Sequence, residues 1–144
     1  MTARFDAIGL VVHDMARSLA FYRMLGLDIP ANSDGEGHVE ATLPGGTRIL
    51  WDTVEMIQSF DTDWTEPSGG QRIGLAFLCD DPTDVNRVYA ELTAAGHEGH
   101  REPWDAFWGQ RYASVKDPDG NGIDLFAPLA ATSRRGSALD PSGG

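Results

Sequence analysis

The hydrophobic and polar residues of the chain follow patterns that predict two similar blocks of strands and helices. An apolar run over residues 5–12 predicts a strand, and Asp14 is placed to cap a helix that ends near Leu25, before Gly26. Residues 38–43 then alternate between polar and apolar positions, as in a strand whose two faces have different environments. These elements begin the first block.

The first block is completed by a short strand over 27–30 and by a return strand over 47–52, which follows a Pro-Gly-Gly turn at 44–46. The stretch 53–70 mixes one helical segment, 54–60, with loop residues. It is predicted to connect the two blocks.

The second block repeats the order of the first. Its expected elements are a strand over 72–79, a helix from Asp81 to Gly96 with Pro82 at its first position, a short strand near 97–102, a strand over 110–116, a turn at 117–121 and a strand over 123–127.

The repeated order predicts an α+β protein of two βαβββ modules. Each module is expected to form a curled mixed sheet with a helix on one face, and the other faces are expected to line a groove. We expect one domain over 1–129, with module one at about 4–52 and module two at about 71–129. Residues 130–144, which include Arg134 and Arg135, are predicted to be a disordered tail.

Composition narrows the class of partner. A formal net charge of −11 and a pI near 4.5 disfavour nucleic acid and anionic membranes and suit a neutral or cationic ligand. The lone cysteine, Cys79, lies in an apolar run and is expected to be a small core residue. No signal peptide or membrane span is expected, and a cytoplasmic location follows.

Aromatic residues crowd the segment before the strand at 110–116. Trp104, Phe107 and Trp108 stand there, where an ordinary loop would be polar. This crowding indicates a binding site. The chain has no Gly-x-Ser-x-Gly motif, phosphate loop, dinucleotide fingerprint or Cys/His pair that would indicate catalysis.

Two segments resemble the vicinal-oxygen-chelate superfamily, also called the glyoxalase/bleomycin resistance/dioxygenase fold. They are VHDMARSLAFY at 12–22, followed by Leu-Gly, and DPDGN at 117–121, followed by Ile-Asp-Leu. Within the superfamily, the stretches WDTVE at 51–55, EGH at 98–100 and WGQRYA at 108–113 are most similar to the mitomycin-binding antibiotic-resistance proteins.

Enzymes of the superfamily hold a divalent metal through residues on the first and fourth strands of each module. The resemblance therefore identifies the positions in this chain where metal ligands would stand. The matching positions here are Ala7, about Leu50, Gly74 and Asp124. Three of these four residues have no donor atom, so no metal cofactor is expected.

The resemblance implies that Trp108 and His38 stack on opposite faces of a planar drug ring. Small residues such as Gly9 would leave space in the groove. The parity of the strands adds further ligand-binding candidates, which are Tyr112, Ser114, Leu50, Asp52, Arg48, Glu40 and Asp124. Trp51 has the opposite parity and is expected to pack under a helix.

The resemblance also implies a homodimer with two shared grooves. The expected function is metal-independent sequestration of a planar antitumour antibiotic, a mitomycin-like quinone or a related polycyclic or enediyne drug, which would confer self-resistance. Two alternatives remain open. One is a metal-dependent enzyme of the glyoxalase or dioxygenase type, and the other is a carrier of a biosynthetic intermediate.

Overall fold

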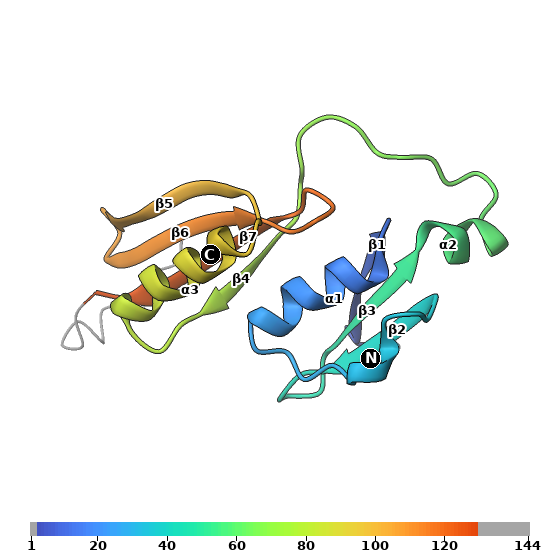
Figure 1. The fold of residues 1–144 in the computed structure, drawn as a ribbon, viewed down its shortest axis with the longest axis horizontal. Coiled ribbons are helices and arrows are strands. Elements are labelled where there is room, and N and C mark those ends of the chain that lie inside the picture. The colour runs from blue at the N-terminus through green and yellow to red at the C-terminus, as the bar shows by residue number, and fades with distance from the viewer. Residues whose placement is uncertain (1–2, 130–144) are drawn as a thin grey trace. The chain divides into compact units, whose positions relative to one another are not determined.

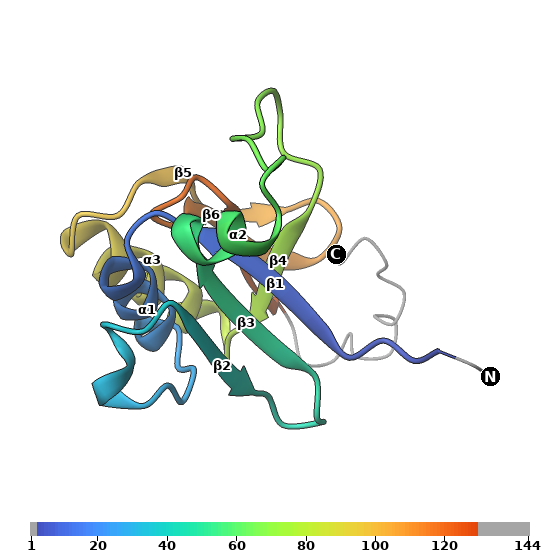
Figure 2. The same cartoon turned by 90° about the vertical axis from the view of Figure 1, so that its right-hand side faces the viewer.

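The structure, a computed structural model, describes residues 3–129. The chain divides into two compact units, with the boundary between Gly69 and Gly70 (Figure 1). The first unit contains a three-stranded sheet, and Figure 2 labels its strands together with the helices α1 and α2. Its elements are β1 (Ala7–Val12), α1 (Met15–Met24), the 3₁₀ helix η1 (Ala31–Ser33), β2 (His38–Thr42), β3 (Arg48–Thr53) and α2 (Val54–Phe60).

The first sheet has β3 at its centre, parallel to β1 and antiparallel to β2. The Asp14 side chain accepts a hydrogen bond from the backbone N–H of Arg17 and so caps α1, as predicted. Alternate residues of β2 and β3 are buried, and among them Trp51 is fully buried with its ring centroid 5.7 Å from that of Tyr22 on α1. The prediction that Trp51 packs under the helix is confirmed.

The prediction of a strand over 27–30 is wrong. The structure has no strand there. The backbone carbonyls that a strand would have paired instead accept hydrogen bonds from the Arg23 guanidinium. It donates to the carbonyl oxygens of Ile29 and Pro30 at 3.3 and 2.6 Å, and to the Asp34 carboxylate at 2.9 Å. Pro30 also has no N–H to offer a neighbouring strand. The first sheet therefore has three strands.

The second unit has the predicted order of one strand, one helix and three strands. Its elements are β4 (Gly74–Leu78), α3 (Pro82–Ala94), β5 (Gly99–Ala106), β6 (Gln110–Lys116) and β7 (Gly122–Pro128). The sheet order is β4-β7-β6-β5, with β4 parallel to β7 and the other pairs antiparallel. Asp81 caps α3 by accepting from the backbone N–H of Asp84, and Pro82 opens the helix.

The two faces of the second sheet differ as the alternation predicts. Val85 and Leu92 of α3 are fully buried, as are the apolar residues of β6 and β7 that face the helix, and Figure 1 shows α3 lying over this sheet. The turn at 117–121 forms because one Asp117 oxygen accepts from the N–H groups of Asp119 and Asn121.

The predicted short strand at 97–102 is too short. β5 continues to Ala106 and pairs irregularly with β6, with two register shifts between Gly99 and Trp104. Pro103 and these shifts break the period-2 pattern, so the full length of this edge strand cannot be recognised from the sequence. Trp104 therefore lies in a strand and not in a loop.

The predicted α+β fold class is confirmed, with one helix-covered mixed sheet in each unit. The prediction of a disordered tail at 130–144, with Arg134 and Arg135, lies outside the described residues. Cys79 is half-buried, and burial raises the pKa of its thiol. Over residues 3–129, no helix has the length and apolar character needed to cross a membrane.

Candidate functional site

The face of the first sheet away from α1 holds all six ligand-binding candidates of the first block. Strand pairing aligns Gly9, Leu50 and Glu40 across the sheet, and it aligns His38 with Asp52. Arg48 has the same parity on β3. The structure thus brings these six predicted residues onto one face.

Charged side chains on this face form a continuous chain of hydrogen bonds, which we call the charged row: Asp52, His38, Glu40, Arg48 and Asp6. His38 Nδ1 lies 2.6 Å from Asp52 Oδ1, and His38 Nε2 lies 2.8 Å from Glu40 Oε2. Arg48 donates to Glu40 at 2.7 Å and to Asp6 at 2.6 Å. The row joins the strand face to a residue that precedes β1.

Two carboxylates accept at both ring nitrogens of His38 only when the imidazole is doubly protonated. The hydrogen bond to Glu40, followed by that to Asp52, raises the pKa of His38 above its ordinary value. The same contact with His38, followed by that with Arg48, lowers the pKa of Glu40. Both nitrogens of the His38 ring are therefore engaged, and 39% of its side-chain surface is exposed.

The open face of the second sheet holds a buttressed carboxylate. Strand pairing aligns Ala76 and Ser114 with Asp124, and aligns Tyr112 with Phe126. The Tyr112 hydroxyl donates to Asp124 Oδ2 at 2.8 Å and the Ser114 hydroxyl to Oδ1 at 2.9 Å. Burial, followed by the bond to Asp124, raises the pKa of the Tyr112 phenol, so it stays a neutral donor.

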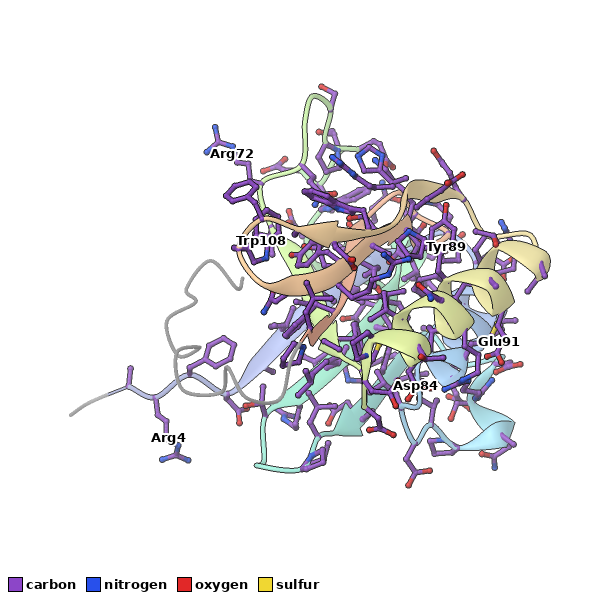
Figure 3. The ribbon with its side chains drawn as sticks, turned by 90° about the vertical axis from the view of Figure 1, so that its left-hand side faces the viewer. Arg4, Arg72, Asp84, Tyr89, Glu91 and Trp108 are labelled. Carbon is purple, nitrogen blue, oxygen red and sulfur yellow. The ribbon has the colours of Figure 1, made fainter. Side chains whose placement is uncertain are left out.

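Five aromatic rings continue from Tyr112 along this unit, and we call them the aromatic row: Trp104, Phe107, Trp108, Tyr112 and Phe126. Trp108 lies at the turn between β5 and β6 (Figure 3). Its ring meets three others edge-on, with centroids 5.5 Å from Trp104, 4.9 Å from Phe107 and 5.3 Å from Tyr112. Trp108 Nε1 donates to Gln110 Oε1 at 2.8 Å, which fixes the indole. Trp108 is thus the centre of the row.

Several members of this surface were not among the predicted site residues. Phe126 lies two residues after Asp124, so period-2 parity places it on the same face and could have identified it. Gln110 shares the parity of Tyr112 and Ser114 on β6 and could have been identified in the same way. Arg101 carries no such signal. The Arg101 guanidinium lies 4.0 Å from the Trp104 ring centroid, a contact that the irregular pairing of β5 makes possible.

The positions that the resemblance assigns to metal ligands do not fit a metal. Ala7, Leu50 and Gly74 have no donor side chain, so Asp124 is the one position of the four that could supply a ligand, and a metal site needs three or four. Among residues 3–129, no group of three or more His, Cys, Asp or Glu side chains is placed to hold a metal ion.

Two helix-backed mixed sheets in one chain define a protein of the paired-module α+β class. The chain belongs to the Glyoxalase/Bleomycin resistance protein/Dioxygenase superfamily, whose family model matches residues 4–125.

Solved structures share the fold of this chain. A glyoxalase/bleomycin resistance protein/dioxygenase family enzyme from Burkholderia phytofirmans has a TM-score of 0.74 at 18% identity, covering 88% of this chain and 100% of that chain. A glyoxalase/bleomycin resistance protein/dioxygenase from Nocardioides has a TM-score of 0.68 at 23% identity, covering 90% of this chain and 85% of that chain.

A glyoxalase-related enzyme from Fulvimarina pelagi has a TM-score of 0.72 at 22% identity, covering 86% of this chain and 87% of that chain. At these identities, the likeness to the three structures shows the fold alone. No curated protein matches the sequence.

Proposed function

We propose that the protein binds and sequesters a planar, largely apolar antibiotic in the cytoplasm without altering it chemically. Mitomycin-like quinones are the first candidates and related polycyclic or enediyne drugs follow. The aromatic row carries this proposal. Its rings are packed against one another, yet Phe107 is 89% exposed and Trp108 is only half-buried, so a flat ligand has a preformed apolar surface to cover.

His38 is the proposed second contact. Its ring is held at both nitrogens by Asp52 and Glu40, so it offers a fixed flat surface at little further cost in side-chain entropy. We propose that the ligand stacks on Trp108 with one face and on His38 with the other, within a homodimer. Stacking of this kind adds about 0.5–1.5 kcal/mol per ring beyond area burial.

The proposal is tested by intrinsic tryptophan fluorescence and calorimetry during titration with mitomycin C and with an anthraquinone, on chelator-treated protein. We expect saturable quenching at one ligand per chain. Trp108→Ala should weaken binding by about 10- to 100-fold, because the ligand loses its central stacking partner. Trp108→Phe should retain part of the affinity. Trp64→Ala is the matched control, because Trp64 lies in the segment between α2 and β4 and outside the aromatic row, and it should bind as the wild type does.

Circular dichroism must show that Trp108→Ala remains folded. An unfolded variant would place Trp108 in the core and remove it from the binding surface. Quenching that occurs only after a divalent ion is restored, or turnover of the bound quinone, would replace sequestration by an enzymatic function. Light scattering of the same sample tests the proposed dimer.

A further inference from the structure

Asp124 is the half-buried carboxylate at the centre of the second sheet's open face. Its hydrogen bonds from Tyr112 and Ser114 use one acceptor direction on each oxygen, and a carboxylate has about four. Among residues 3–129, no basic side chain forms an ion pair with it. Its negative charge is held in place and remains available on the outward side.

The two basic residues closest to Asp124 in the strand register do not pair with its carboxylate. Lys116 lies two positions beyond Ser114 on β6 and pairs with Gly122, and it forms no ion pair with Asp124. Arg101 is aligned with Ser114, but its guanidinium lies over the Trp104 ring. Neither residue neutralises the Asp124 carboxylate.

The rings beside Asp124 favour a cation as well. The electron-rich faces of aromatic side chains attract positive groups, and the contact of Arg101 with Trp104 at 4.0 Å is such an interaction within this surface. Tyr112 bonds to Asp124 and also contacts Trp108 and Phe126, so the carboxylate and the rings form one surface. The net charge of −11 draws cations toward the protein.

We infer that the ligand is a planar aromatic molecule bearing a protonated amine, with Asp124 as the counter-ion. The inference rests on the proposed function and narrows its ligand class. The ring system stacks on Trp108, and the ammonium group donates hydrogen bonds to Asp124. Tyr112 and Ser114 act as positioning residues, since their hydroxyls fix the carboxylate toward the ligand.

The test compares doxorubicin with N-acetyldoxorubicin, which have the same planar ring system and differ by acetylation of the amine. Calorimetry at low and at moderate salt should give the ammonium form an affinity about tenfold higher, with the ratio decreasing as salt rises. Asp124→Asn should bring the ratio close to one. Asp105→Asn is the control, because Asp105 is an exposed residue of the same sheet that pairs with Arg111, and it should retain the preference.

Each outcome decides the inference. Equal binding of both probes by the wild type would overturn the cationic ligand class while leaving sequestration standing. A preference that survives in folded Asp124→Asn protein would overturn Asp124 as the counter-ion. If Asp124→Asn does not fold, Ser114→Ala provides the second variant, with a reduced ratio supporting the inference and an unchanged ratio contradicting it. Failure of mitomycin C and both doxorubicin probes to bind would overturn the proposed function itself.

Discussion

The open faces of the two sheets hold opposite kinds of side chain on closely similar frameworks. In both units a central strand is parallel to the first strand and antiparallel to a neighbouring one, and a helix covers the other face. The first sheet exposes the charged row, in which a histidine and an arginine alternate with three carboxylates. The second exposes the aromatic row, with one carboxylate held by hydroxyls.

The difference follows from what folding requires of each face. The helix-covered faces must be apolar in both units, because their burial stabilises the fold. The open faces have no such requirement, so their side chains can diverge. The charged row should respond to pH and salt, and the aromatic row should respond to the removal of ring surface.

The largest expected effect is that of Tyr112→Ala, which removes the ring between Trp108 and Phe126. We expect the free energy of unfolding, measured in urea, to fall by about 2 kcal/mol. This is less than the ~3–5 kcal/mol of fully buried aromatic residues, because Tyr112 is only half-buried. Tyr112→Phe keeps the ring and should cost about half as much, through the lost hydroxyl bond to Asp124.

Phe107→Ala is the control for this prediction. Phe107 belongs to the same row but is 89% exposed, so its removal should change stability by less than about 0.5 kcal/mol. A loss as large as that of Tyr112→Ala would mean that the row is a structural core and not a surface prepared for a ligand.

A smaller effect is expected for Arg48→Met, which removes the link between Glu40 and Asp6. The melting temperature should fall less than in Tyr112→Ala, because exposed ion pairs contribute little. The difference from the wild type should shrink at high salt, where such pairs are screened. Arg87→Met, which breaks exposed pairs on α3, gives the baseline for a surface ion pair outside the row. An effect of Arg48→Met that is independent of salt would contradict the electrostatic character of the charged row.

The fold could be predicted from the sequence where local patterns determine it. Period-2 alternation over 38–43 and 110–116 placed polar and apolar residues on the correct faces, and Asp14 and Asp81 begin the helices because their carboxylates cap the first turn. These signals lie within a few residues of one another, so they can be read without tertiary contacts.

The remaining features depend on contacts between distant residues. The carbonyls at 29–30 are taken by the side chain of Arg23, and Asp6 joins the charged row through Arg48, 42 residues away. The aromatic crowding near Trp108 was visible in the sequence. Its packing against Tyr112 was not, because β5 pairs with β6 through two register shifts that no local pattern encodes.

The smallest expected effect is the pH dependence conferred by His38. Its pKa is raised from 6.5 in the folded protein, so its contribution to stability is complete below pH 6.5 and is lost as the pH rises through the raised value. The pKa of Glu40 is lowered from 4.5, so its contribution is present above pH 4.5 and is lost as the pH falls through the lowered value. Both contributions are complete only between these two ordinary pKa values.

The melting temperatures of the wild type and of His38→Gln should therefore differ most near pH 5.5, midway between those values, and converge above the raised pKa of His38. NMR titration of the His38 ring should give a pKa above 6.5 that falls in Glu40→Gln, because the Glu40 bond is the larger cause of the shift. His13, which is exposed and paired with Glu66 outside the charged row, is the control in the same spectra, and its signal should not change in Glu40→Gln. A difference that grows toward alkaline pH would mean that His38 is stabilised as the neutral ring, and the contrast between the charged row and the aromatic row would then lose its electrostatic basis.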